Sequence, residues 1–231
     1  MTGMTGRIVA RSAETSMIGN DVVDLGDPET RAWVRHPRFD ARVFSDSERA
    51  LIAASADADR MRWVLWAAKE SAYKVARKEE PRTVFAPSRF VVSLDRDGRA
   101  TVHVDARRFD VDVVAGGDHV HAVARSAGMV PDEGCVAVAA IGSDVQLDRA
   151  TSSRDSVPAG AWLPGAAARC LAIVTLARLA GVAPQDLAIH RDGRIPMLYF
   201  HGRRSQADLS LSHHGRFVAF ACAVPSHWRL R

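Results

Sequence analysis

The chain has 231 residues, of which 47% are hydrophobic and 25% charged, and its net charge is +4. This length allows one large domain or two small ones, and the composition is that of an ordinary globular protein. No apolar run approaches the roughly 20 residues that a membrane-spanning helix needs. The three cysteines are odd in number and widely spaced, which argues against a disulfide framework or a zinc site. We therefore expect a cytoplasmic protein with reduced thiols.

The first half of the chain predicts a strand, then helices, then further strands. No apolar segment like that of a signal peptide opens the chain, and we expect residues 1–15 to form a disordered tail. Ser45 and Glu48 predict a capping box at a helix start. A longer helix is expected over residues 63–77, ended by Pro81. The segments typical of strands are 18–25, 90–94, 101–104, 109–114 and 119–125.

The pattern restarts after a predicted linker over residues 128–134. A strand over 136–140 leads into Ile141-Gly142-Ser143-Asp144, which echoes Ile18-Gly19-Asn20-Asp21. The echo is short, so a true repeat and a coincidence both stay open. A helix and two strands follow, and we expect two αβ halves, residues 16–127 and 135–225. The segments behind this expectation are the helix 166–179, the strands 207–212 and 217–224, and a final tail over 226–231.

Glu70 and Lys74 are the most informative residues of the long predicted helix. They stand four positions apart and therefore on one face. Trp63 and Trp66 lie on the same face at helical spacing, so an apolar stripe runs into a carboxylate. The simplest interpretation is a solvated ion pair, which contributes only about 0.2–0.5 kcal/mol. The other interpretation is a partly buried pair that binds a metal ion or a phosphate.

Three segments together resemble the motifs of the 4'-phosphopantetheinyl transferase superfamily. They match its G-x-D strand, its W/F-x-x-K-E-x-x-x-K helix and its S-[LI]-S-H strand end, and they span residues 19–21, 66–74 and 210–213. In the large surfactin-type members, two similar halves pack about a pseudo-twofold axis. The resemblance therefore implies an α+β fold in which each half packs a helix on a small antiparallel sheet.

The order of the two halves differs from that of the surfactin-type enzymes. In those enzymes the half with the S-H strand comes first. Here residues 16–127 resemble the second half and residues 135–225 the first. We therefore expect a circularly permuted chain, which is tolerable where the termini of a domain lie close together. The same resemblance implies a monomer that works as a pseudo-dimer.

The resemblance also implies a reaction and a metal site. The family moves the phosphopantetheine arm of coenzyme A to a serine of an apo acyl or peptidyl carrier protein, often in secondary metabolism, and releases adenosine 3',5'-bisphosphate. It implies Mg²⁺ bound by Asp21 and Glu70, with Glu70 also acting as a base through a water, and Lys74 stabilising phosphate charge or the attacking hydroxyl. Many surfactin-type enzymes carry a second acid where this chain has Val23. A water or Glu48, which lies in an F-S-x-x-E stretch like that of the family, is expected to replace that acid.

Coenzyme A is expected to contact the second half. Ser212 and His213 match the S-H pair that the family places near the phosphates of coenzyme A. Arg194 resembles the cation of the family's G-[KR]-P turn, although Ile195 is inserted before the proline. Arg169, on the second predicted helix, is expected at the adenosine phosphates.

Three further residues are interpreted from the sequence. Asp24 is expected to be structural, because strand alternation points it away from the face of Asp21. Arg216 is expected to be a solvated turn residue. Lys69 is open between a solvated position and a phosphate contact.

Two other functions remain possible from the sequence. Val23, the reversed order and the Gly-Arg-Ile-Pro variation fit a catalytically inactive protein that binds coenzyme A or a carrier protein as a partner or regulator. The basic pI of about 9.3 fits a nucleic-acid-binding module, but no basic stripe interleaved with aromatic residues supports it.

Overall fold

The computed structural model describes residues 17–31, 36–95, 99–127, 135–143 and 164–225. The predicted tails and the predicted linker lie outside the described residues. Within them the chain forms two five-stranded antiparallel sheets, so the predicted α+β class is confirmed. None of the described helices is long and apolar enough to cross a membrane.

The first sheet has the strand order β1-β5-β4-β3-β2 and the second has the order β6-β10-β9-β8-β7. The strands of the first sheet are β1 (Ile18–Asp24), β2 (Val91–Leu94), β3 (Ala100–Val104), β4 (Arg107–Ala115) and β5 (His119–Ser126). Those of the second sheet are β6 (Cys135–Ser143), β7 (Leu187–Asp192), β8 (Ile195–Phe200), β9 (Arg203–His214) and β10 (Phe217–Pro225). In each half the first strand is an edge strand beside the last, so the same topology occurs twice.

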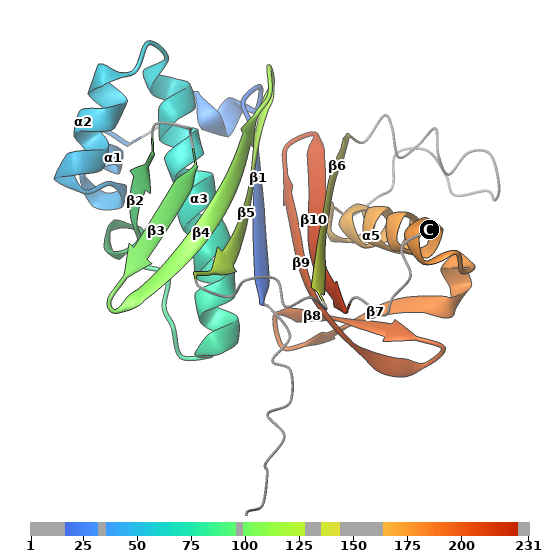
Figure 1. Ribbon diagram of the computed structural model, residues 1–231. Helices are drawn as coiled ribbons and strands as arrows, with labels where there is room; N and C mark the ends of the chain where they lie inside the picture. The colour runs from blue at the N-terminus through green and yellow to red at the C-terminus, as the bar shows by residue number, and fades with distance from the viewer. Residues whose placement is uncertain (1–16, 32–35, 96–98, 128–134, 144–163, 226–231) are drawn as a thin grey trace, which may run out of the picture.

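The helices follow the first strand of each half (Figure 1). They are α1 (Phe39–Val43), α2 (Asp46–Ala54) and α3 (Ala58–Glu79) in the first half and α5 (Pro164–Ala180) in the second, with short 3-10 turns at Pro28–Thr30, Pro87–Arg89 and Pro184–Asp186. The predicted capping box is confirmed: Ser45 caps α2 and Glu48 completes the pair. The long helix is also confirmed, but it begins five residues earlier than predicted, where Asp57 caps it.

Helix α3 covers one face of the first sheet with small and branched apolar side chains. Leu65, Ala68, Ala72, Val75 and Ala76 are all fully buried there. They recur at helical spacing, so the amphipathic pattern predicts the buried face. Helix α5 packs on the second sheet in the same way, around Leu176 and Leu209.

Strands β7 and β8 were not expected; the sequence predicts only a turn there. Residues His190 to Asp192 of β7 are exposed and polar, which hides the alternation. Pro196 lies within β8, and prolines weaken a strand prediction because they cannot donate to a neighbour. Strands β7 and β8 nevertheless pair as an antiparallel hairpin and form the outer part of the second sheet. The paired residues run from Asp192 with Ile195 to Leu187 with Phe200.

The two halves repeat the same strand order, but the similar sequences around Gly19 and Gly142 do not occupy equivalent positions in it. Asp24 pairs with His119 at the start of β5, and Ser143 pairs with Phe217 at the start of β10. Asp24 and Ser143 are therefore equivalent by position. Gly19 pairs near the end of β5, whereas Gly142 pairs near the start of β10, so the two glycines are not equivalent.

The two halves meet where the free edge of β1 lies against β9, at the centre of Figure 1. The backbone N–H of Ile18 donates to Asp208 Oδ2 at 2.7 Å, and that of Asn20 donates to Ser210 Oγ at 3.0 Å. The N–H of Asp24 donates to His214 Nδ1 at 3.1 Å. The residues of each pair are 190 positions apart in the sequence. Side chains on one face of β9 therefore accept hydrogen bonds from N–H groups along the edge of β1, without a shift in register.

Two lysines of α3 donate hydrogen bonds to backbone carbonyls of β1. Lys78 Nζ donates to the carbonyl of Ile18 at 2.7 Å, and Lys74 Nζ donates to the carbonyl of Asn20 at 2.8 Å. Polar backbone groups that leave water need such partners, and an open strand edge supplies a row of them. The side chains of α3 and β9 thus replace a neighbouring strand and hold the halves together.

Gly19 allows α3 to approach β1 closely. A Cβ atom at this position would lie 2.1 Å from the carbonyl oxygen of Ser71, a backbone atom that cannot move alone. We expect Gly19→Ala to lower the free energy of unfolding by about 1–3 kcal/mol, as overpacking does. Asp21, two residues further on, should move as well. Gly117→Ala is the control for chemical denaturation, because no atom lies within 4 Å of the added Cβ; equal stability of both variants would contradict the account.

Candidate active site between the halves

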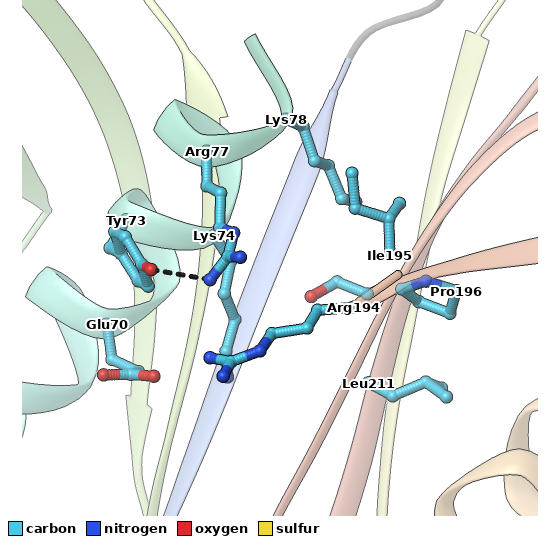
Figure 2. A pocket seen from close by; sticks show the side chains of 10 residues that line it. Glu70, Tyr73, Lys74, Arg77, Lys78, Arg194, Ile195, Pro196 and Leu211 are labelled. Carbon is cyan, nitrogen blue, oxygen red and sulfur yellow. Dashed lines mark hydrogen bonds between the residues drawn. The ribbon is translucent and has the colours of Figure 1, made fainter. Parts of the chain in front are cut away.

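A pocket of about 220 Å³ opens between α3 and the second sheet. One wall carries charged side chains of α3, and the other comes from the turn between β7 and β8 and from β9 (Figure 2). The lining residues are Glu70, Tyr73, Lys74, Arg77, Lys78, Arg194, Ile195, Pro196, Ser210 and Leu211. The structure therefore brings together Glu70, Lys74 and Arg194 of the predicted site.

Glu70 and Asp21 form a pair of partly desolvated acids beside the pocket. Burial first, and then the negative charge of Asp21, raise the pKa of Glu70 against the lowering effect of Lys74, to a net value of about 7. Burial likewise raises the pKa of Asp21, against the lowering effect of Lys74. No described residue forms a hydrogen bond or ion pair with Glu70. Two such carboxylates repel each other, and a cation between them would stabilise both in the ionised form.

Lys74 does not form the predicted pair with Glu70. Its Nζ lies 3.0 Å from Asp21 Oδ1 and also binds the carbonyl of Asn20. Its side chain is only 24% exposed, so the interpretation as a solvated helix pair is wrong. The lysine instead links the acid of β1 to the helix that carries Glu70.

Asp21 and Glu70 are suited to a hard divalent cation. Carboxylate oxygens are the protein ligands that Mg²⁺ prefers, and Mg²⁺ keeps several waters, so two protein ligands suffice. The raised pKa of Glu70 fits the same site, because a bound cation would remove the cost of ionising it. We regard these two residues as the candidate metal ligands.

Asp27, Glu29 and His214 form another cluster of possible metal ligands, with their ligand atoms within 4.8 Å of one another. His214 Nδ1 accepts the N–H of Asp24, so the ring proton lies on Nε2 and no ring nitrogen offers a free lone pair. Asp27 Oδ1 accepts the N–H of Glu29 at 2.8 Å. These side chains close the end of β1, and we assign no ion to them.

Glu48 has a structural role, and the suggestion that it binds the metal is not supported. Its carboxylate is fully buried, accepts the N–H groups of Ser45 and Val92, each at 2.7 Å, and pairs with Lys69 Nζ at 2.7 Å. It does not line the pocket. Lys69 is fully buried as well and also donates to the carbonyls of Pro87 and Phe90. This lysine is neither solvated nor placed at a phosphate.

Ser212 and His213 lie at the interface beside the pocket. Ser212 Oγ accepts a hydrogen bond from Asn20 Nδ2 at 2.8 Å, so this serine contacts β1 and does not line the pocket. Desolvation and then the charge of Lys74 lower the pKa of His213, while Asp21 opposes them. His213 is therefore close enough to Asp21 and Lys74 for their charges to affect its pKa.

Arg194 and Arg169 differ in position. Figure 2 shows Arg194 reaching from the β7–β8 turn across the pocket toward α3. Arg194 therefore lines the pocket although Ile195 stands between it and the proline. Arg169 lies in α5 and does not line the pocket.

Asp24 and Arg216 join the halves at the far end of β1. The guanidinium of Arg216 binds both carboxylate oxygens of Asp24, at 2.8 and 2.7 Å. These hydrogen bonds hold the pKa of Asp24 well below its usual range. The contacts agree with a structural Asp24. Arg216 lies in a turn with its side chain 57% exposed, as expected, but it also pairs with this acid.

Sequence reasoning missed Lys78, Asp208, Arg77 and Tyr73. Lys78 continues the four-residue spacing of Glu70 and Lys74, which was the available signal. Its Nζ lies 2.7 Å from Asp208 Oδ2, and the lysine side chain is 6% exposed. The pairing with Asp208 joins residues 130 positions apart, and no local pattern predicts it.

The raised pKa of Glu70 predicts a pH dependence of stability. Its pKa is about 7 in the folded chain against 4.5 without the protein environment. The folded state therefore binds more protons between these values, so the free energy of unfolding falls as pH rises through this window, by up to about 3 kcal/mol. Denaturation without divalent ions should show Glu70→Gln equal to the wild type near pH 4 and more stable at pH 8. A constant difference at both pH values would contradict the assignment.

Residues 17–124 match the family model described as ACPS, the 4'-phosphopantetheinyl transferase superfamily. The match covers somewhat less than half of the chain, so the first half of the chain resembles this superfamily. The matched segment contains Asp21, Glu70 and Lys74 but none of the predicted residues of the second half. No curated protein matches the chain.

Solved structures of the transferase superfamily resemble about half of the chain. A holo-[acyl-carrier-protein] synthase from Neisseria meningitidis is 16% identical, with 48% of this chain and 96% of that chain covered and a TM-score of 0.41. The ACPS–CoA complex from Chronobacterium ammoniagenes is 20% identical, with 49% and 97% covered and a TM-score of 0.41. The acyl carrier protein synthase of Mycobacterium tuberculosis is 22% identical, with 48% and 95% covered and a TM-score of 0.36.

Proposed function

We propose that this chain transfers the 4'-phosphopantetheine arm of coenzyme A to a serine of an apo acyl or peptidyl carrier protein, with Mg²⁺, and releases adenosine 3',5'-bisphosphate. The observation that carries the proposal is the pocket between the halves. There Glu70 and Lys74, with Asp21 beside them, face Arg194 of the second half. We further propose that the chain is a circularly permuted surfactin-type enzyme located in the cytoplasm. We also propose that it works as a monomer, because one chain supplies both walls of the pocket.

In the proposed reaction the serine oxygen bonds to the phosphorus that carries the pantetheine arm. The bond from this phosphorus to the bridging oxygen breaks, and adenosine 3',5'-bisphosphate leaves with that oxygen. Asp21 and Glu70 would hold Mg²⁺, which when bound supplies positive charge to the diphosphate. Lys74 and Arg194 add fixed positive charge from the two walls of the pocket.

Glu70 is the proposed acceptor of the serine proton, directly or through a water. A proton acceptor must be ionised, and bound Mg²⁺ would hold Glu70 in that form although its pKa without an ion is raised to about 7. Lys74 is held between Asp21 and the backbone of β1, beside the proposed position of the reacting group.

Chromatography of the nucleotide products tests this proposal. Incubation of the full chain with coenzyme A, an apo carrier protein and Mg²⁺ should release adenosine 3',5'-bisphosphate in proportion to modified carrier. EDTA should stop the release, and added Mg²⁺ should restore it. Intact coenzyme A after incubation with acyl and peptidyl carriers would contradict the proposal.

The second candidate is an inactive coenzyme A- or carrier-binding partner, favoured by one observation. Val23 is buried in the core of the first half, on the strand face that carries Asp21, where many surfactin-type enzymes have an acid. An inactive binder should bind coenzyme A almost equally well with Mg²⁺ and with EDTA. An enzyme of the proposed kind should bind it more tightly with the ion.

A further inference from the structure

Some of the charged side chains that line the pocket have an ion-pair partner and others have none among the described residues. Four cations face it, and the carboxylate of Glu70 is the acid among the lining residues. Lys74 is paired with Asp21 at 3.0 Å, and Lys78 is paired with Asp208 at 2.7 Å. Arg77 and Arg194 form no ion pair with any residue that the structure describes. The unopposed positive charge of the pocket therefore lies on the two arginines.

Arg77 is held in place for binding. Its Nη1 donates to the hydroxyl of Tyr73 at 3.0 Å, the dashed contact in Figure 2. The ring of Tyr73 is stacked on Phe85, with centroids 4.7 Å apart. A guanidinium has five N–H donors, so most of those of Arg77 are left for a ligand at the pocket. An anchored guanidinium loses less entropy on binding a phosphate than a mobile one.

The spacing along α3 separates the backbone positions of Arg77 and Glu70. Arg77 follows Glu70 by seven residues, or about 10 Å along the helix axis. Arg194, in contrast, reaches toward the Glu70 end of the pocket (Figure 2). Under the proposed function the diphosphate of coenzyme A occupies the Glu70 end. Coenzyme A has one other phosphate, on the 3'-oxygen of its ribose, and this group must lie some distance from the diphosphate.

We propose that Arg77 binds the 3'-phosphate of coenzyme A and is the residue that makes this protein prefer coenzyme A to 3'-dephospho-coenzyme A. This inference rests on the proposed function for the identity of the ligand. Tyr73 acts as a positioning residue, because it contacts the arginine and not the phosphate.

Calorimetric titration of the full chain with coenzyme A and with 3'-dephospho-coenzyme A, both with Mg²⁺, tests the proposal. The wild type should bind coenzyme A more tightly by on the order of 10- to 100-fold, the range for hydrogen bonds between charged groups. Arg77→Gln should remove most of this preference by weakening coenzyme A alone. Tyr73→Phe should reduce the preference by a smaller factor, and Arg77→Lys should restore part of it.

Two control variants distinguish a specific loss of the preference for coenzyme A from the effect of removing any positive charge. Arg194→Gln should weaken both ligands alike and leave their ratio unchanged. Arg82→Gln removes an exposed arginine beyond the end of α3 and should change neither affinity. Equal weakening of both ligands by Arg77→Gln, or no weakening, would overturn the proposal. Wild-type binding with the expected preference but without transfer to any carrier would contradict the proposed function alone.

Discussion

Glu70→Gln is expected to reduce transfer to a carrier protein by about 1,000-fold, since a positioned acid or base contributes on the order of 100- to 10,000-fold. The substitution keeps the shape of the side chain and removes its charge. It therefore eliminates both a candidate metal ligand and the proposed proton acceptor. Glu70 has no hydrogen bond to any described residue, so the fold should persist. Initial rates at saturating coenzyme A and Mg²⁺ give the comparison.

Glu79→Gln is the matched control on the same helix. Glu79 lies at the last turn of α3, 3.9 Å from Arg107, and does not line the pocket. Its substitution should leave the rate within about twofold of the wild type, as surface changes usually affect little. A Glu70→Gln variant with near wild-type rates would remove Glu70 from the proposed mechanism.

Lys69→Met is expected to be the most destabilising of these substitutions, at about 3–5 kcal/mol in the free energy of unfolding. Both Lys69 and Glu48 are fully buried, and their charged atoms lie 2.7 Å apart. Without the lysine, the Glu48 carboxylate would remain in the core with only the two backbone N–H donors of Ser45 and Val92. Urea denaturation at neutral pH measures the loss.

A double variant separates the pair from packing alone. Glu48→Leu with Lys69→Met replaces both charges by apolar groups, which often costs little for a buried pair. It should be more stable than Lys69→Met, although it loses the capping contact of α2. If the single and double variants lost the same stability, the charges would not be coupled. Where Lys69→Met is still folded, its transfer rate should stay near that of the wild type, because Lys69 does not reach the pocket.

Much of the site follows from local patterns in the first half. The spacing of Glu70 and Lys74 depends only on helix geometry, and the Ser45–Glu48 capping box depends only on residues three apart. Asp21 and, in the second half, Arg194 were named through the resemblance to the motifs of the superfamily. Each of these predictions needed a motif that is complete within about ten residues.

The rest of the site depends on contacts that span the whole chain. Whether Lys69 or Lys74 is buried, and with which acid, is decided by β1 and α2 packing on α3. The partners of β1 in the second half lie 190 positions away along the chain. The local sequence also gave no reason to read Ser210 and Ser212 as partners of β1 and not of a ligand. Gly19 could be recognised as part of a motif, but its physical requirement appears only when α3 packs against it.

The most direct test of the account is the intact mass of an apo carrier protein after incubation with this chain, coenzyme A and Mg²⁺, beside a reaction with Glu70→Gln. The account predicts that the carrier gains the mass of one phosphopantetheine arm with the wild type and gains none with the variant over the same time. An unmodified carrier in both reactions, with binding of coenzyme A intact, would contradict the proposed transfer and identify the chain as a binding protein.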